Sequence, residues 1–436
     1  MSQSEPIIEV GIVSGIELSF NFKYPYRLSQ NNSGNKNTFC GIYTIHIQNE
    51  QIFFDQQYFQ NLEFEPIDKG HATFELFNVK IGIGFHWERS EKQAFEGNLK
   101  FITEENKITA INRILLESYL TSVISSEMSA KASAELLKAH AVISRSWLLS
   151  QLQQKNRDCP KNTEFTENES ERIRWYDRED HANFDVCADD HCQRYQGITR
   201  ASTPQVKEAI NATHGQVLTS NNGICDARFS KCCGGMLEEF QYCWENSPKP
   251  YLKGIRDLAT DQKVDLRIEK NAETWILGNP PSFCNTSDKS ILQQVLNDYD
   301  QETSDFYRWT VTYTTSEISH LINMRSGIDF GEILELIPIE RGVSGRIVRL
   351  KIAGSKKSLI IGKELEIRKA LSTSHLYSSA FVVKKTINGF TLYGAGWGHG
   401  VGLCQIGAAM MSEKGYIYTE ILSHYYPNTE LKKLYD

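Results

Sequence analysis

The sequence lacks any apolar run that could cross a membrane as a helix. Such a helix needs roughly 20 consecutive apolar residues, and no run in the 436 residues approaches that length. The opening stretch, MSQSEPIIEVGIVSG, has neither a basic start nor a long apolar core, so it does not have the form of an export signal. We therefore expect a cytoplasmic protein if the chain starts at its native end. If an export signal has been removed, we expect a protein of the periplasm or cell envelope.

An excess of positive charge is also missing. The formal net charge is -7 at pH 7, whereas general nucleic-acid binders carry a basic surface, so we expect no nucleic-acid partner. Cysteine is too sparse, at ten residues, for a small disulfide scaffold. The adjacent Cys232 and Cys233 are poorly placed to bond to each other. Thiol or metal-binding roles are therefore the expectation for the cysteines.

A β-rich start and a mixed C-terminal part indicate an α+β protein. The composition, 40% hydrophobic and 23% charged, is that of an ordinary globular protein, and the length predicts two or three domains. From residue 6 to about residue 100, short apolar or alternating runs are broken by Gly, Asn and Asp, as strands are. Helix and strand patterns mix further on, with a hairpin predicted to turn at Gly342 to Gly345. We divide the chain into four parts, 1–100, 101–250, 251–390 and 391–436.

The middle of the chain contains three more local patterns. Residues 151–180 are polar and charged, which favours an exposed insertion over a separate domain. Residues 204–213 have a helical pattern that stops at Gly215. The sequence Asn221-Asn222-Gly223 predicts the turn of a hairpin.

Residues 116–150 contain two helical patterns separated by a short break. Apolar residues of the first recur at the i, i+3, i+4, i+7 and i+8 positions of an amphipathic helix, and they are Leu116, Tyr119, Leu120, Val123 and Ile124. The second pattern follows Ser133, a suitable N-cap residue, and its apolar residues are Leu136, Ala139, Ile143 and Trp147. We therefore predict a central helical pair.

Glu127 lies in the break between these two helices. The C-terminal end of the first helix has a negative dipole, and Ile124 and Met128 provide apolar surroundings. Both effects favour the protonated carboxyl group, which is the form that a general acid needs at neutral pH. The alternative is a solvated loop residue without a chemical role.

A second constellation combines two histidines and two cysteines within twelve residues, His181, Cys187, His191 and Cys192. Imidazole and thiolate are the ligands that tetrahedral zinc prefers. The spacing is not that of a zinc finger, and the neighbouring His191 and Cys192 can chelate together only in a bent loop. Two buried thiols beside two surface histidines are the alternative.

The third constellation is the glycine-rich run GAGWGHGVGLCQ, residues 394–405. Its glycines permit a close approach of the backbone to a ligand, and the helix predicted behind it can point amides at oxygen atoms. The run does not match a dinucleotide fingerprint, because extra glycines break the G-x-G-x-x-G frame. His399 and Gln405 are its polar side chains, although a lone histidine in a glycine turn often has only a structural role.

The pair Cys232-Cys233 is followed by Gly234 and Gly235 and is a candidate for a reactive thiol. A cysteine nucleophile needs a depressed pKa and a base, and among sequence neighbours only Lys231 carries charge. A thiol enzyme is therefore an alternative with little local support.

Several segments, taken in order, resemble the SpoIID/LytB family. They are ESYLTSVISSEM, LLKAHAVISRSWLL, QRYQG, THGQVLTSNNGICDARFSKCCGG and GWGHGVGLCQIGAAMMSEKGYIYTEILSHYYPNTEL. The family contains sporulation-type lytic transglycosylases, which act on peptidoglycan, and proteins called amidase enhancers. The resemblance implies a SpoIID-like α+β fold whose central helical pair carries the catalytic glutamate.

The resemblance also assigns roles by position. Glu127 matches the catalytic glutamate, with Ser129 in place of the usual proline. The metal site of the sporulation enzymes, which holds zinc, matches His181, Cys187, His191 and Cys192. Residues that line the substrate cleft match Gln193, Tyr195 and His399, and Gln405 is a further substrate-binding candidate from the glycine-rich run. Thiols at Cys232 and Cys233 stand where the family has hydroxyls.

The implied activity is a lytic transglycosylase that cleaves the β-1,4 bond from N-acetylmuramic acid (MurNAc) to N-acetylglucosamine (GlcNAc) and leaves a 1,6-anhydroMurNAc end. Peptidoglycan strands would be the substrate, Glu127 the acid and base, and zinc a structural cofactor. One alternative is a non-catalytic enhancer that binds peptidoglycan or an N-acetylmuramoyl-L-alanine amidase. Another is a zinc or thiol hydrolase centred on Cys187, Cys192 or Cys233.

Overall fold

The computed structural model describes residues 4–29, 38–82, 89–129, 132–155, 165–175, 181–189, 192–199, 203–259, 264–295 and 305–436. The chain forms two compact units, and each is built from segments that are distant in sequence. The first unit contains Met1–Ala130, Asp180–Gln216 and Lys433–Asp436, and the second contains Lys131–Glu179 and Val217–Lys432.

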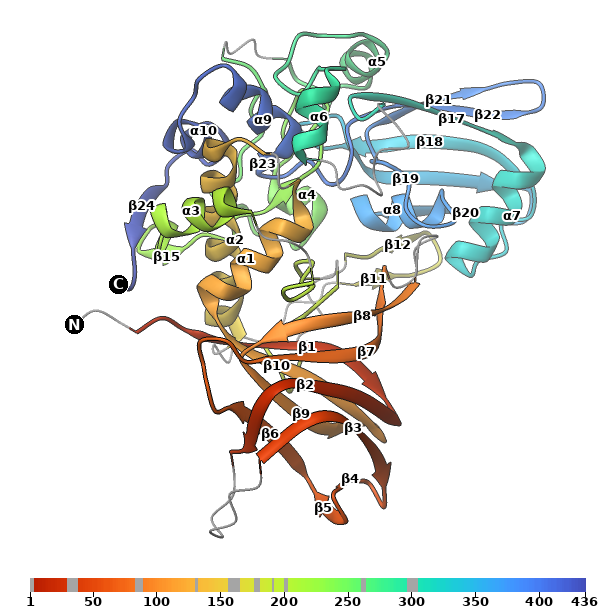
Figure 1. Ribbon diagram of the computed structural model, residues 1–436. Helices are drawn as coiled ribbons and strands as arrows, with labels where there is room; N and C mark the ends of the chain where they lie inside the picture. Colours follow the sequence, from red (N-terminus) through yellow and green to blue (C-terminus); the bar gives the residue numbers. More distant parts are fainter. Residues whose placement is uncertain are drawn as a thin grey trace. The chain divides into compact units, whose positions relative to one another are not determined.

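The first unit is built on a large, mostly antiparallel sheet, drawn from red to orange in Figure 1. Its strand order is β13-β1-β10-β9-β6-β2-β3-β4-β5, and β7 pairs with β2 and β8. The strands are β1 (Ile7–Gly15), β2 (Glu17–Leu28), β3 (Thr38–Gln48), β4 (Gln51–Phe54), β5 (Gln57–Phe59), β6 (Asn61–Pro66), β7 (Thr73–Ile81), β8 (Arg89–Glu96), β9 (Asn98–Glu104), β10 (Lys107–Leu115) and β13 (Val186–Cys187).

Alternating aromatic residues give this sheet its core. Strand β6 illustrates the pattern, because its buried positions alternate with more exposed ones. Phe64 on β6 is fully buried and lies 5.0 Å from the ring centre of Phe22. Phe22 also stacks on Tyr26 at 4.2 Å, and each such ring buries about 150–250 Å². The predicted β-rich N-terminal part is therefore confirmed, and it extends through β10.

Two helices complete the first unit, α1 (Leu116–Glu127) and α3 (Pro204–Ala212). Helix α1 follows β10 without a loop, and all five apolar residues predicted for its inner face are fully buried. Thr203 caps the N-terminus of α3, because its side chain accepts a hydrogen bond from the Val206 N–H. After it, Gly215 has a φ of 69°, which suits the predicted glycine stop.

The second unit combines helices with smaller sheets. Its helices are α2 (Ala134–Lys155), α4 (Phe240–Cys243), α5 (Glu269–Leu277), α6 (Lys289–Val295), α7 (Thr315–Ser326), α8 (Glu364–Ala370), α9 (Gln405–Glu413) and α10 (Tyr418–Tyr425). Its strands are β11 (Thr166–Glu167), β12 (Glu171–Ile173), β14 (Gln216–Ser220), β15 (Gly223–Ile224), β16 (Phe229–Ser230), β17 (Arg308–Thr314), β18 (Ile333–Arg341), β19 (Ile347–Gly354), β20 (Ser358–Gly362), β21 (Phe381–Lys385), β22 (Gly389–Ala395), β23 (Leu403–Cys404) and β24 (Glu430–Lys433).

Two sheets enclose the main core of the second unit, and their strands β17 to β22 run from blue-green to blue in Figure 1. One has the order β11-β12-β20-β19-β18 and the other the order β17-β22-β21. Strands β18 and β19 form the hairpin predicted around Gly342 to Gly345, and Gly345 there has a φ of 80°. Trp309, Phe330 and Phe381 are central members of a buried apolar cluster.

The polar segment after α2 is more ordered than its composition predicts. Within 165–175, strand β12 pairs in parallel with β20, so part of the predicted exposed insertion belongs to a sheet. The charged side chains are compatible with a strand because they form ion pairs and hydrogen bonds with neighbouring residues. Glu171 pairs with Arg349, and Arg172 donates to the Ser326 carbonyl at 2.6 Å and pairs with Glu167.

Other local predictions are confirmed in the second unit. Helix α2 begins directly after Ser133, and α9 begins at the end of the glycine-rich run. The hairpin of β14 and β15 turns at Asn221 and Asn222, which have φ angles of 49° and 63°. Within the part of the chain that the structure describes, no helix is both long and apolar enough to span a membrane.

Candidate functional site

Glu127 is the last residue of α1, so the helix includes the residue that was predicted to lie in the break after it. The helix ends there because Met128 adopts an extended conformation, while its N–H still donates to the Ile124 carbonyl. The Glu127 side chain is half-buried. Its Oε1 accepts a hydrogen bond of 2.9 Å from the backbone N–H of Arg194. The carboxylate is therefore held by a loop that is distant in sequence.

That loop follows one face of α1. The Tyr119 hydroxyl donates to the Gln193 side-chain oxygen at 3.3 Å, and the Tyr195 ring stacks on the Tyr119 ring at 5.1 Å. One turn further, the Ser122 hydroxyl accepts from the N–H of Gln196 at 3.1 Å. Residues 119 and 122 share a helical face, so the loop and the helix are joined at several points. The position of the Arg194 N–H beside Glu127 depends on this whole arrangement.

The same loop brings three of the four predicted metal ligands together. His181, Cys187 and Cys192 form a group whose ligand atoms all lie within 4.8 Å of one another. The Cys192 sulfur and the His181 Nε2 lie 3.6 Å apart. One nitrogen and two sulfur donors fit a zinc-type ion. The fourth predicted ligand, His191, lies outside the described residues.

Strand β1 positions this group. Cys187 on β13 pairs in parallel with Gly11 on β1. A Cβ at Gly11 would lie 2.7 Å from the Phe184 ring, so the strand needs a glycine there. The Phe184 ring in turn stacks on His181 at 4.5 Å. The sheet of the first unit therefore supports the arrangement of histidine and thiols.

Gln193 and Tyr195, predicted to line a substrate cleft, are both buried. Each is at most 2% exposed. The Tyr195 hydroxyl donates to the Asn112 side-chain oxygen at 2.5 Å, and burial raises the pKa of that hydroxyl. Tyr195 also lines a pocket with Glu96 and Lys207. Their contacts explain how the loop is held against α1, and their substrate-binding role stays a prediction.

His399 and Gln405 belong to the second unit, at the glycine-rich segment. The glycines at 396, 398, 400 and 402 all have φ angles between 71° and 90°, a region that other residues rarely adopt. His399 is half-buried, and its Nδ1 accepts from the Val401 N–H at 3.0 Å. Loss of solvent around the ring, together with the charges of Arg228 and Arg346, holds the pKa of His399 well below its usual value. The imidazole is therefore neutral at physiological pH.

Gln405 is buried at the start of α9. Its side-chain nitrogen lies 3.3 Å from the Nε2 of His140, and the Nδ1 of His140 lies 3.2 Å from the Ser144 hydroxyl. Burial lowers the pKa of His140 to about 3, so this ring is also neutral. The contacts give Gln405 a place in the interior of the second unit, and its substrate contact stays a prediction.

Sequence reasoning missed a buried charged network behind the glycine-rich segment. Glu238 is fully buried, and its carboxylate accepts from the Ser344 hydroxyl at 2.6 Å and from the Val343 N–H at 3.0 Å. The Glu238 N–H donates to the Gly400 carbonyl at 2.9 Å. Arg346 lies in the same network. The sequence signal was the predicted turn at Gly342 to Gly345, which includes Ser344 but gives no indication of its acidic partner Glu238.

The stability of the protein should depend on pH through Glu238. Burial raises the pKa of Glu238 from 4.5 to about 7, although its hydrogen bonds and Arg346 act in the opposite direction. Because the folded value exceeds the unfolded one, the contribution to stability is fully present below pH 4.5 and is lost as the pH rises through about 7. A tenfold difference in proton affinity between the folded and unfolded chains corresponds to about 1.4 kcal/mol.

Urea unfolding of wild type and Glu238→Gln between pH 4.5 and 8 measures this contribution. We expect the free energy of unfolding of wild type minus that of the variant to fall across this interval. Glu335→Gln, which makes the same change on the exposed side of β18, should leave the difference constant. A pH-independent difference for Glu238→Gln would show that the carboxyl is ionised throughout.

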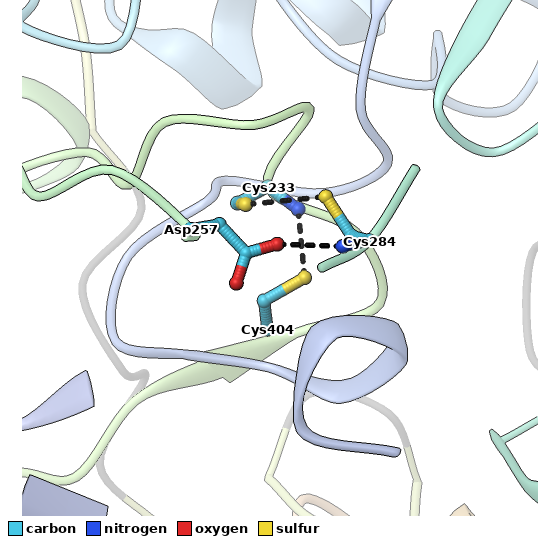
Figure 2. Close-up of side chains that lie close together, drawn as sticks. All are labelled: Cys233, Asp257, Cys284 and Cys404. Carbon is cyan, nitrogen blue, oxygen red and sulfur yellow. Dashed lines mark hydrogen bonds between the residues drawn. The ribbon is translucent and has the colours of Figure 1, made fainter. Parts of the chain in front are cut away.

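Cys233 belongs to a buried cluster of the second unit, with Asp257, Cys284 and Cys404 (Figure 2). Burial raises the pKa of both Cys232 and Cys233 well above the usual value. A thiolate nucleophile at this pair is therefore not favoured. The four clustered residues can hold a metal ion.

Two family models match separate parts of the chain, and several curated proteins are similar to most of it. Residues 104–220 match the family model described as Stage II sporulation protein, and residues 238–402 match one described as a domain of unknown function (DUF8618). Stage II sporulation protein D of Bacillus amyloliquefaciens is 24% identical over 326 residues, which are 74% of this chain and 76% of that protein. The protein of the same name from Bacillus subtilis (strain 168) is 23% identical over 327 residues, with the same coverage.

A third relative carries a different name. The Amidase enhancer of Bacillus subtilis (strain 168) is 25% identical over 335 residues, which are 72% of this chain and 40% of that protein. The first family model includes α1 with Glu127, α2, the histidine and cysteine group, and α3. These matches confirm the predicted resemblance of the chain to the SpoIID/LytB family.

Proposed function

We propose that this protein is a peptidoglycan lytic transglycosylase that cleaves the MurNAc–GlcNAc β-1,4 bond, with Glu127 as general acid and base. One observation carries the proposal. The Glu127 carboxylate lies at the end of α1 and accepts a hydrogen bond from the Arg194 N–H, in the loop that also carries the histidine and cysteine group. The resemblance to the SpoIID/LytB family suggests the substrate class.

The chemistry requires only one carboxyl group. Protonated Glu127 donates its proton to the glycosidic oxygen, and the bond between that oxygen and C1 of MurNAc breaks. The 6-hydroxyl of the same MurNAc attacks C1, and the Glu127 carboxylate accepts the hydroxyl proton. The products are a GlcNAc 4-hydroxyl and a 1,6-anhydroMurNAc end, and no water is consumed. Because the nucleophile belongs to the substrate, the second carboxylate of an ordinary glycosidase is not required.

The histidine and cysteine group is proposed as a structural zinc site. His181, Cys187 and Cys192 would provide three ligands and His191 the fourth, so that the site is closed. Bound zinc would supply rigidity to the loop and no chemical step. The loop residues then act on Glu127 through the Arg194 N–H.

Replacing Cys192 by Ser tests this structural role. We expect the variant to lose one metal equivalent and at least about tenfold in kcat, because the loop beside Glu127 loosens. Cys192→His restores a zinc ligand and should recover much of both, whereas Cys40→Ser, at an exposed thiol of the same unit, should change neither. Full activity of metal-free Cys192→Ser would contradict the role.

The proposed substrate lies outside the cytoplasmic membrane, so we propose an extracytoplasmic location. Glycan strands are the expected direct partner. Digestion of purified peptidoglycan, with and without stem peptides, followed by mass spectrometry of the products tests the activity. Anhydromuramyl ends support a transglycosylase, and reducing ends instead would indicate a hydrolase.

The competing proposal is a non-catalytic enhancer that binds peptidoglycan or an amidase. The similarity to an Amidase enhancer favours it. This function predicts no new glycan ends, together with faster release of stem peptides when an N-acetylmuramoyl-L-alanine amidase is added. The same digestion, run with and without the amidase, separates the two functions.

A further inference from the structure

The interior of the second unit contains four metal-ligating side chains from four separate segments. They are Cys233, Asp257, Cys284 and Cys404, and each is at most 2% exposed. Their ligand atoms all lie within 4.8 Å of one another. Figure 2 shows the side chains converging from different parts of the chain. The segments are far apart in sequence, with Cys233 and Cys404 separated by 171 positions.

The sulfur spacing matches the edge of a tetrahedron around one ion. The sulfur atoms of Cys233 and Cys284 lie 3.6 Å apart. A disulfide would require about 2.0 Å. Two thiolates bound to one zinc ion at about 2.3 Å each stand roughly 3.8 Å apart. A [4Fe–4S] cluster attaches each cysteine to a different iron and separates the sulfurs further, so the spacing does not suit such a cluster.

Backbone N–H groups orient the potential ligands, as is usual for metal thiolates. The Cys404 sulfur accepts from the Cys233 N–H at 3.2 Å, and the Cys233 sulfur accepts from the Gly235 N–H at 3.4 Å. Asp257 accepts from the Cys284 N–H at 2.8 Å and from the Tyr425 hydroxyl at 2.7 Å. A carboxylate has about four acceptor positions, so these bonds leave room for an ion.

The loop after Cys233 is shaped for this convergence. Gly234 and Gly235 have φ angles of 81° and 101°. A Cβ at Gly234 would lie 2.9 Å from the backbone nitrogen of Gly396, and one at Gly235 would lie 2.9 Å from the Tyr307 hydroxyl. Glycines are needed at both places, and the tight turn lets the Gly235 N–H reach the Cys233 sulfur.

Buried thiols can also act simply as small apolar side chains, and Asp257 argues against that explanation. An ionised carboxyl group beside three thiols in a solvent-free interior is costly unless a cation accompanies it or the group takes up a proton. The hydrogen-bond donors that reach its oxygens, from Tyr425, Ser282 and Cys284, are neutral. A divalent ion would compensate the carboxylate and the thiolates together.

We propose that Cys233, Asp257, Cys284 and Cys404 bind one thiophilic divalent cation, with zinc the best fit, in a second metal site separate from the histidine and cysteine group. Three sulfurs and one oxygen complete a tetrahedron, so the site is closed and structural. It joins the loop at Cys233, the segments at Asp257 and Cys284, and the start of α9. The site thereby ties the end of the glycine-rich run, at Cys404, to three other segments of this unit.

Metal content and cobalt spectra of the full chain test the site. We expect purified wild type to release one more zinc equivalent than Cys284→Ser or Cys404→Ser. Cys225→Ser, at a buried thiol of the same unit outside the cluster, should retain the full content. Wild type reloaded with Co²⁺ should show charge-transfer absorption from five thiolates, three from this site and two from Cys187 and Cys192. A chain with only the histidine and cysteine site would show two.

The cobalt measurement needs no substitution, so it decides even if the cysteine variants fail to fold. Absorption from two thiolates only, with one metal equivalent per chain, would overturn the proposal. A second result would also overturn the proposal. If alkylation under denaturing, non-reducing conditions leaves Cys233 and Cys284 unmodified, the two cysteines form a disulfide. Absorption from three thiolates, with one metal equivalent per chain, would support this site and would count against zinc at Cys187 and Cys192.

Discussion

Glu127→Gln should lower the rate of anhydromuramyl formation by a factor of about 10² to 10⁴, the usual contribution of a general acid–base group. Gln has nearly the same size as Glu and its side-chain oxygen can still accept from the Arg194 N–H. The substitution therefore removes the transferable proton and changes little else. The rate is measured by mass spectrometry of products from purified glycan strands.

Two further variants make this test specific. Glu127→Asp keeps an acid but shortens it by one methylene, so the carboxylate moves away from the Arg194 N–H, and we expect an intermediate rate. Glu105→Gln, in the exposed turn between β9 and β10 of the same unit, should retain the wild-type rate. Co-sedimentation with insoluble peptidoglycan should be equal for all of them, since Glu127 acts in the chemical step. Normal product formation by Glu127→Gln would exclude the assignment.

Local patterns in the sequence predicted the elements around Glu127 well. The spacing of Leu116, Tyr119 and Val123 defines the buried face of α1, because helix periodicity is a property of neighbouring residues. The group of His181, Cys187 and Cys192 was also visible, since its members are close in sequence. Such features need no knowledge of the tertiary fold.

Features made by distant segments were not predictable in this way. Cys233 and Cys284 are separated by 51 residues, and a separation of that length does not match any short metal-binding motif. The same holds for Glu238 and Ser344, 106 residues apart, which meet only because the β18–β19 hairpin returns to that point. The return of residues 180–216 to the first unit is a third case. Each depends on chain topology and not on local composition.

Arg346→Met should destabilise the protein by about 3–5 kcal/mol, the cost of removing one partner from a buried charged network. Arg346 is 1% exposed, and its guanidinium donates to the carbonyl oxygens of Gly398 at 2.9 Å and of Cys233 at 3.1 Å. Its charge also favours the ionised form of Glu238. Met has a similar volume, so the loss reports the unpaired carbonyls and the uncompensated carboxylate.

Urea unfolding at pH 8 measures this effect, with Arg267→Met as the control. Arg267 is an exposed partner of Asp265, and exposed ion pairs contribute about 0–1 kcal/mol. Arg346→Lys keeps the charge but cannot reach two carbonyls with a planar fork, so its free energy of unfolding should lie between wild type and Arg346→Met. Equal stability of Arg346→Met and Arg267→Met would mean that the network carries little energy. A large loss would instead show that Arg346 supports the backbone of both the glycine-rich segment and the Cys233 loop, since one guanidinium bonds to both.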